Sequence, residues 1–434
     1  MPRPSSLFAV FLFSSTTAGY AWAQEAAGPP EPSDAAVLAE VAAVCAADAG
    51  ALWGLDLCGP VLVADPATRR VIANQKGASD ILSSDGGVFS GVLPTQVNIA
   101  NTATDWDGVR WTMLQAPLPE DPIARASLIA HESWHRVQPQ LGLPAASPTP
   151  AHLATLEGRA AMRLEWRALA AALAAPDVLT RKVAVADALA FRAARRLQGG
   201  ASAGEDERSL EMNEGLAEYT GLRLSGSTQP LEDATAVLRA AERGASYSRT
   251  FAYASGPAYG LLLDEASPRW REGLSKDADL GGLLAAALGL EAVTDPVDAA
   301  RLAGMRYGAA QVLEEEAAKA SADRAVTDLW LEKLVRGPTL TLPFSNMQIG
   351  FDPNTLRPLP PHGTVYPTLR VSDVWGVLEV TDGALIDGNW SRAVVAAPLD
   401  AGARSGPGWT LTLKDGWSLD AAARAGDFVA RRVP

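Results

Sequence analysis

Alternating hydrophobic and polar positions predict two β-hairpins in the first third of the chain. One hairpin spans 59–74, and the other spans 96–116 with its turn at Asp107-Gly108. An Asp-Gly pair accepts the positive φ angles that tight hairpin turns require. Before the hairpins, an Ala-rich stretch at 35–47 has the composition of a helix.

The hydrophobic pattern then changes to helical spacing. Asp121 can cap a helix, and Pro122 suits its first position. We expect this helix to run to Gln138 and to end before Pro139. From 149 to about 336 the pattern is helical throughout and predicts six to eight helices, with breaks near Pro176, Gly199, Gly226, Pro268 and Pro296.

Beyond residue 337 the composition shifts to Pro, Gly and short alternating runs, such as 369–380 and 409–413, which predict strands. The chain is therefore expected to be α+β. The expected organisation is a signal peptide at 1–23, a domain at 24–337 with a β-containing part at 55–120 and a helical part at 121–337, and a small β-rich C-terminal unit at 338–434.

The first 23 residues have the pattern of a cleavable signal peptide. They contain Arg3, an apolar run at 7–13 and a small-x-small sequence at 21–23. We expect the mature chain to begin at about Gln24 and to be periplasmic or secreted. No later segment has about 20 uninterrupted apolar residues, so stable membrane insertion is not expected.

Net charge restricts the classes of binding partner that we expect, and the cysteine content bears on the cellular compartment. The 434 residues carry a formal charge of −13, which disfavours nucleic acid and anionic membranes as partners. Cys45 and Cys58 are the only cysteines. In an exported chain such a pair favours a disulfide, and the alternative is two small core residues. The oligomeric state is left open.

The helix predicted at 122–138 carries a His-Glu-x-x-His motif formed by His131, Glu132 and His135. Residues four apart lie on one face of a helix, so both imidazoles can bind one zinc ion. Glu132 is turned by about 100° from His131, which suits it to hold and deprotonate a metal-activated water as general base. The alternative is an amphipathic helix with two surface histidines, but the whole chain has only 4 His.

A catalytic zinc needs a third protein ligand, and residues 213–219 read Asn-Glu-Gly-Leu-Ala-Glu-Tyr. This segment resembles the third-ligand helix of gluzincin metallopeptidases of the aminopeptidase N type. The resemblance, which covers at most residues 95–265, implies Glu214 as the ligand, one Zn²⁺ per chain, and a thermolysin-like core with a small N-terminal sheet and a mainly helical lobe. Independently of the family, Gly215 lacks a side chain and is expected to let its helix lie close against the helix that carries the histidines.

The spacing departs from the family, because 78 residues lie between His135 and Glu214, far more than is usual there. An inserted set of helices accounts for the difference. The competing third ligand is Glu157, which lies nearer the usual distance and also precedes a Gly. Its other interpretation is a surface or ligand-orienting carboxylate, as for Glu165 and for Glu218, which lies one turn after Glu214.

The segment 253–256, Tyr-Ala-Ser-Gly, carries a second resemblance. Gluzincins place a Tyr before such a Gly on a later helix, where its hydroxyl donates a hydrogen bond to the oxyanion. This implies Tyr253, with Tyr247 and Tyr259 as alternatives and a buried core tyrosine as the plain interpretation. His152 could contact substrate, or cap or pack a helix.

Two further comparisons with the family bear on the substrate. The Gly-x-Met-Glu-Asn segment with which aminopeptidases recognise a free amino terminus does not occur in the sequence, so aminopeptidase activity is not implied. The strand at 109–116 precedes the motif helix, and the corresponding edge strand of the family pairs with an extended peptide. We expect an exported zinc metallopeptidase that acts on a peptide or protein.

Two alternatives remain open at this point. One is a zinc hydrolase of another amide, such as a cell-wall peptide or an acylated metabolite. The other is a non-catalytic envelope binding module on the same scaffold. Glu132 argues against the second alternative, because metal binding alone does not require it.

Overall fold

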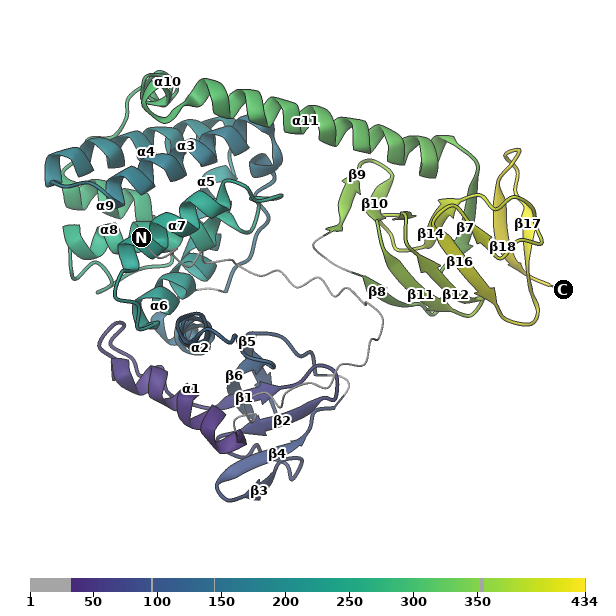
Figure 1. Cartoon of the computed structure of the whole chain (residues 1–434), viewed down its shortest axis with the longest axis horizontal. Coiled ribbons are helices and arrows are strands. Elements are labelled where there is room, and N and C mark those ends of the chain that lie inside the picture. The colour runs from purple at the N-terminus through teal and green to yellow at the C-terminus, as the bar shows by residue number, and fades with distance from the viewer. Residues whose placement is uncertain (1–32, 95–96, 144, 352–354, 434) are drawn as a thin grey trace, which may run out of the picture. The chain divides into compact units, whose positions relative to one another are not determined.

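The structure, a computed structural model, describes residues 33–94, 97–143, 145–351 and 355–433. The predicted signal peptide lies outside these residues. The chain divides into two compact units between Glu316 and Ala317, inside one long helix. Figure 1 shows helices and a sheet in the first unit and β-sheets in the second, so the predicted α+β character, with a helical lobe and a β-rich C-terminal part, is confirmed.

Six strands of the first unit form one sheet in the order β3-β4-β2-β1-β6-β5. They are β1 (Val61–Ala64), β2 (Arg70–Ala73), β3 (Ser83–Asp85), β4 (Val88–Val92), β5 (Thr102–Trp106) and β6 (Val109–Gln115). β1 and β6 are parallel, and the other pairs are antiparallel. Side chains alternate along β1, so that Leu62 packs with Met113 in one apolar cluster while Val63 packs with Leu114 in another.

Both predicted hairpins are confirmed, with one correction. Asp107 and Gly108 have φ angles of 50° and 74°, as a tight two-residue turn requires. The first arm of this hairpin is β5, displaced from the predicted 96–104. β6 lies between β1 and β5, so the prediction that this strand is an edge was wrong, and β5 ends the order instead. Strand order depends on pairing with the distant β1, which the local pattern does not encode.

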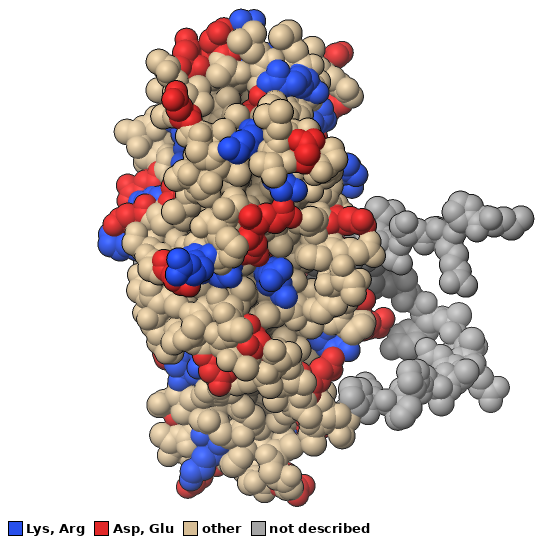
Figure 2. Space-filling view, turned by 90° about the vertical axis from the view of Figure 1, so that its left-hand side faces the viewer, with Lys and Arg blue, Asp and Glu red and all other residues tan. Residues whose placement is uncertain are grey.

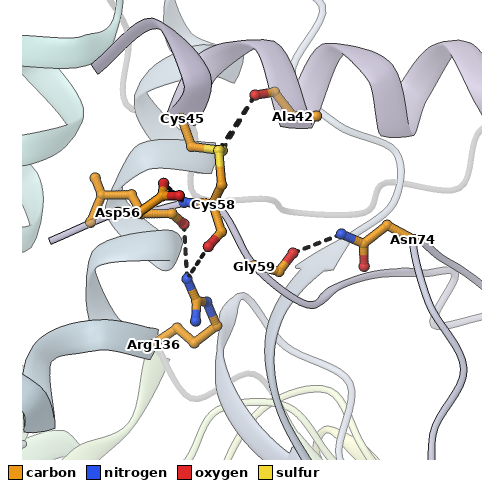
Figure 3. Close-up of a disulfide and its surroundings, with 8 residues drawn as sticks. Ala42, Cys45, Asp56, Cys58, Gly59, Asn74 and Arg136 are labelled. Atoms are coloured by element: carbon orange, nitrogen blue, oxygen red, sulfur yellow. Dashed lines mark hydrogen bonds between the residues drawn. A yellow bond between two sulfur atoms is a disulfide. The ribbon is translucent and has the colours of Figure 1, made fainter. Parts of the chain in front are cut away.

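The predicted disulfide between Cys45 and Cys58 is present and joins α1 (Asp34–Asp48) to the segment before β1 (Figure 3). Arg136 of the motif helix donates a 2.9 Å hydrogen bond to the backbone oxygen of Cys58. A Cβ on Gly59 would lie 2.3 Å from the Arg136 Cζ atom, so the absence of a side chain makes room for the guanidinium. The disulfide and Arg136 together tie α1, this segment and the motif helix to one another.

The remaining helices of the first unit form a lobe on the other side of the motif helix from the sheet (Figure 1). The motif helix, α2, contacts β5 and β6 and also α6. The helices are α2 (Pro122–Val137), α3 (Leu156–Leu173), α4 (Val178–Gly199), α5 (Ala203–Leu210), α6 (Leu216–Leu224), α7 (Pro230–Ala241), α8 (Phe251–Ala266), α9 (Leu280–Leu288), α10 (Pro296–Tyr307) and α11 (Ala309–Leu331).

The described residues 149–336 contain nine α-helices, where the sequence pattern predicts six to eight. The predicted breaks near Pro176, Gly199 and Gly226 are confirmed. An additional break comes from a π-helical turn, η3 (Glu211–Gly215), between α5 and α6. The chain stays helical through this turn and all five of its residues are buried, so the local sequence pattern does not signal the break.

A buried ionic network crosslinks this lobe. Arg195 of α4 is fully buried and pairs with Glu165 of α3 and with Glu207 of α5 at 2.7 Å. Arg192, one turn earlier, pairs with Glu165 and donates a 2.8 Å hydrogen bond to Glu211 of the π turn. Every carboxylate in the set has a guanidinium partner, so the charges are compensated within the core.

The second unit contains two β-sheets, ordered β17-β18-β7-β14-β13-β10-β9 and β15-β16-β12-β11-β8. The strands are β7 (Thr339–Pro343), β8 (Gln348–Phe351), β9 (Arg357–Leu359), β10 (Gly363–Tyr366), β11 (Leu369–Asp373), β12 (Gly376–Val380), β13 (Ala384–Ile386), β14 (Arg392–Ala396), β15 (Ser405–Gly406), β16 (Trp409–Leu413), β17 (Trp417–Ala421) and β18 (Phe428–Arg432). Trp375 and Trp409 lie in the core between them. The strands predicted at 369–380 and 409–413 are confirmed as β11, β12 and β16.

The C-terminal half of α11 belongs to this second unit. Trp330 and Leu334, at the end of the helix and in the turn η4 (Glu332–Arg336), pack with Val365 and Leu385 of the sheet. This packing explains why the division falls at residue 316, ahead of the first strand at Thr339.

Two further observations concern the apolar character of the helices and the charge on one face of the molecule. Among the described residues, none of the helices combines the length and the apolar character needed to cross a membrane. On the face shown in Figure 2, acidic and basic side chains are interspersed and do not gather into separate areas.

Candidate metal centre

The motif residues lie on α2 (Pro122–Val137), as the sequence predicts. Asp121 caps the helix by accepting a 2.8 Å hydrogen bond from a backbone N–H of the first turn. Both histidines and Glu132 lie in the last two turns, between the sheet and the lobe. His131 and Glu132 are buried, and His135 is half-buried.

Glu214 reaches the histidines from the π turn η3, where α5 passes into α6. This turn lies close to α8 because a glycine of each element faces the other. A Cβ on Gly215 would lie 3.1 Å from the Gly256 Cα atom, and a Cβ on Gly256 would lie 2.3 Å from the Gly215 Cα atom. The backbones of η3 and α8 therefore touch directly at these two glycines. The prediction that Gly215 lets its helix lie close against the motif helix was wrong about the partner, because the backbone nearest to Gly215 belongs to α8.

The three predicted ligands come together. The Nε2 atoms of His131 and His135 are 3.2 Å apart, and Oε2 of Glu214 lies 3.7 Å and 3.6 Å from them. One ligand atom from each of the three residues falls within 4.8 Å of the others. A triangle with these sides has its centre about 2.0 Å from each corner, which equals the length of zinc–nitrogen and zinc–oxygen bonds. The donor set and its spacing fit a zinc ion.

Each imidazole is oriented by a partner on its other nitrogen. His131 Nδ1 lies 2.9 Å from Glu218 Oε2, and His135 Nδ1 lies 2.9 Å from Gln138 Oε1. Both partner oxygens accept a hydrogen bond, so these contacts favour the tautomer with N–H at Nδ1 and a lone pair at Nε2. The lone pairs then face the centre of the ligand triangle.

A chain of hydrogen bonds continues from Gln138 to the third ligand. Gln138 Nε2 donates to Asn213 Oδ1 at 3.0 Å, and Asn213 Nδ2 donates to Glu214 Oε1 at 3.2 Å. His135 and Glu214 are thereby linked through two buried amides. The sequence analysis assigns no role to Gln138, three residues after His135, or to Asn213, which directly precedes Glu214.

The electrostatics of the site favour a cation. Burial opposes a positive charge on His131, but hydrogen bonds with Glu214 and Glu218 raise its pKa to about 10. Although burial acts in the opposite direction, hydrogen bonds with His131 and His135 hold the pKa of Glu214 well below its usual range. Burial raises the pKa of Glu132. Three carboxylates around two imidazoles thus attract positive charge, whether a proton or a metal ion.

Tyr253, from the first turn of α8, completes the site. Its ring is stacked on that of His131 with centroids 5.8 Å apart, and its hydroxyl donates a 2.6 Å hydrogen bond to Glu214 Oε2. Burial and the charge of Glu214 raise the pKa of Tyr253 far above its usual range, so the hydroxyl remains a donor. Arg249, just before α8, approaches Glu214 Oε1 at 3.5 Å and was not anticipated from the sequence.

The other candidate tyrosines lie elsewhere. Tyr247 is buried and donates to the backbone oxygen of Glu242, while Tyr259 is buried and donates to Glu165 at 2.8 Å. Both have structural partners within the helical lobe.

The remaining candidates are also separate from the ligand group. Glu157 is exposed on the first turn of α3. It is not a member of the possible metal-binding group among the described residues, which consists of His131, His135 and Glu214. Glu165 is fully buried and belongs to the ionic network, so its interpretation as a surface carboxylate was wrong. His152 pairs with buried Glu207 at 2.7 Å, which gives it a packing role.

Comparisons with protein-family models, with curated proteins and with solved structures find no match to this chain.

Proposed function

We propose that this protein is an exported zinc-dependent hydrolase of the gluzincin type that cleaves peptide bonds. The observation that carries the proposal is the convergence of Glu214 on His131 and His135 at the spacing of zinc ligands, although 78 residues separate it from the motif. The resemblance of three ordered segments, 131–135, 213–219 and 253–256, to the gluzincin motifs supports the same conclusion.

Different residues of the site would bind the metal and transfer the proton during hydrolysis. Zinc held by the two imidazoles and the carboxylate supplies Lewis-acid polarisation of a carbonyl and lowers the pKa of water. Glu132 accepts the proton of the attacking water and passes it to the departing amine. Its pKa is raised by burial, which brings it closer to the working pH and suits this shuttle.

Tyr253 supplies the hydrogen bond to the oxygen on which charge develops. Its single hydroxyl hydrogen is donated to Glu214 Oε2 in this structure, beside the candidate metal position, and would be donated to the substrate oxygen instead during the reaction. A donor of this kind stabilises the transition state more than the ground state.

An extended peptide is the substrate shape favoured by the sheet. β5 ends the strand order next to β6, and α2 contacts both strands. A strand at the end of a sheet offers backbone donors and acceptors to an added strand. We therefore propose that substrate lies along β5, whereas the family resemblance implies β6.

The test is metal content and hydrolysis by the mature chain from Gln24. We expect one zinc per chain by elemental analysis, lost in His135→Ala, weakened in Glu214→Ala and retained in the matched control Glu157→Ala. Glu132→Gln should keep its zinc but lose about 10²- to 10⁴-fold in peptide hydrolysis, because only proton transfer is removed.

Three results would contradict the proposal. They are a wild-type chain that binds no zinc when it is supplied, a loss of zinc in Glu157→Ala but not in Glu214→Ala, and a Glu132→Gln variant as active as wild type. Screening the same proteins on amides that are not peptides tests the alternative substrate class.

A further inference from the structure

Arg249 is the charged side chain at the site to which the proposed hydrolysis assigns no task. Its Nη2 atom lies 3.5 Å from Glu214 Oε1, while the opposite oxygen of that carboxylate, Oε2, faces both imidazoles. The Arg249 side chain is 53% exposed. The guanidinium therefore lies at the edge of the ligand set with most of its donors directed elsewhere.

The contact with Glu214 does not explain why an arginine is needed here. Glu214 Oε1 already accepts a shorter hydrogen bond, 3.2 Å, from Asn213, and Oε2 accepts one from Tyr253. A guanidinium carries five N–H donors. One long contact at a half-exposed position adds little to the orientation of Glu214.

The segment that carries Arg249 is firmly held. The buried guanidinium of Arg159 donates to the backbone oxygens of Gly244 and Ala245, both at 3.2 Å, and pairs with Glu316 at 2.6 Å. The same guanidinium lies 3.7 Å above the ring centre of Tyr247, which is fully buried. Anchoring of this kind presents Arg249, two residues after Tyr247, from a defined position, as a specificity-determining group requires.

We propose that Arg249 binds a carboxylate of the substrate that lies within one or two residues of the cleaved bond; this inference rests on the proposed function. An extended peptide advances by at most about 3.6 Å per residue. A substrate carboxylate one or two residues from the bond cleaved at the metal therefore reaches the guanidinium of Arg249. Arginine recognises carboxylates through paired, charge-assisted hydrogen bonds.

The charge of the site supports this assignment. Glu132, Glu214 and Glu218 lie around the imidazoles, and a zinc ion bound there would offset two of their negative charges. Arg249 adds a positive charge on the side of Glu214 Oε1, where an anionic group of the substrate can pair with it. The carboxylate can be the α-carboxylate at the end of a chain or the side chain of an acidic residue, and the experiment separates these two sources.

The experiment measures binding to the zinc-loaded mature protein by calorimetry. The probes are three peptide hydroxamates that share one sequence: the first ends in a free carboxylate, the second in a carboxamide, and the third in a carboxamide preceded by Glu. We expect wild type to bind one of the two carboxylate probes roughly 10- to 100-fold tighter than the plain carboxamide, as charge-assisted hydrogen bonds imply. The preferred probe identifies the source of the carboxylate.

Variants connect the preference to Arg249. We expect Arg249→Gln to abolish the preference and Arg249→Lys to retain part of it. The matched control is Arg243→Gln, which removes one positive charge from an exposed position six residues earlier and should keep the wild-type ratio. Zinc content is measured for each variant.

Three outcomes overturn the inference. They are equal affinities of wild type for all three probes, no binding of any probe to the zinc-loaded protein, and an equal loss of all three affinities in Arg249→Gln together with weakened zinc binding, which would assign Arg249 to holding Glu214. Peptide hydrolysis is measured in parallel. Selective probe binding without hydrolysis would refute the proposed function and leave the carboxylate site standing.

Discussion

Residues outside the ligand set determine how the two imidazoles present their lone pairs. Glu218 holds His131 and Gln138 holds His135, each at 2.9 Å and each through Nδ1. Without these partners the rings can rotate or carry their proton on the wrong nitrogen. The partners are therefore expected to affect metal affinity almost as strongly as a ligand does.

Replacing Glu218 tests this expectation. We predict that Glu218→Ala weakens zinc binding by about 10- to 100-fold, because His131 loses the acceptor that fixes its tautomer and raises its basicity. Competition with a chromophoric chelator measures the affinity. Glu157→Ala removes an equivalent carboxylate from an exposed helix start and serves as the control. Equal affinities of the two variants would show that Glu218 is only a surface group.

Among single residues, the candidate metal ligands were predicted from the sequence, but only some of the residues that hydrogen-bond to them were. His131, Glu132 and His135 follow from spacing on one helix, and Glu214 follows from its resemblance to a known motif. Gln138 and Asn213 could not be found in this way, because their hydrogen bond joins the end of α2 to a turn 75 residues away. Arg249 was missed for a similar reason, since its partner belongs to another element.

At the scale of elements, the contact between η3 and α8 holds the third ligand. Gly215 and Gly256 are the two points of closest approach, and a Cβ on Gly256 would lie 2.3 Å from backbone. Backbone cannot move aside as a flexible side chain can, so one of the two elements must shift when a methyl group is added.

We predict that Gly256→Ala destabilises the fold by about 1–3 kcal/mol or more and weakens zinc binding with it, because separating the two elements displaces Glu214. Thermal unfolding and chelator competition measure the two effects. Gly204→Ala in α5 is the control: its added Cβ lies 3.6 Å from the nearest atom, in ordinary contact, and should be neutral or slightly stabilising. A Gly256→Ala variant as stable as this control would contradict the packing argument.

Local elements were predictable, and their arrangement was not. The turn at Asp107-Gly108 and the cap at Asp121 act within a few residues, so the turn, the strand that follows it and α2 were predicted almost to the residue, while the strand before the turn was displaced. The order of the sheet and the π turn depend on distant partners. β5 became the edge because β6 pairs with β1, and Glu211 of the π turn is bound by Arg192 of α4.

At the scale of the whole molecule, one covalent bond crosslinks the N-terminal part of the first unit. The Cys45–Cys58 disulfide closes a loop with a sequence separation of 13. Its main effect is to restrict the unfolded chain, and a loop of this size corresponds to about 3 kcal/mol. A bond of this kind is also what an exported protein is expected to contain.

We predict that a thiol reductant lowers the free energy of unfolding by about 3 kcal/mol, measured by denaturant titration in the presence and absence of the reductant. A Cys45→Ala/Cys58→Ala double variant should unfold at the same lower denaturant concentration under both conditions, which controls for effects of the reductant itself. Identical midpoints for wild type with and without reductant would contradict the prediction.

The long separation between the motif and its third ligand also has a kinetic consequence. Helices such as α2 can form within microseconds, and α2 brings both imidazoles together by itself. We expect Glu214 to join them late, because α3, α4 and α5 lie between it and the motif in the chain and contacts between distant segments are slow to form. If the proposed zinc site is correct, tight retention of the ion by all three residues would mark a completely folded chain, and a half-folded intermediate would release its ion readily.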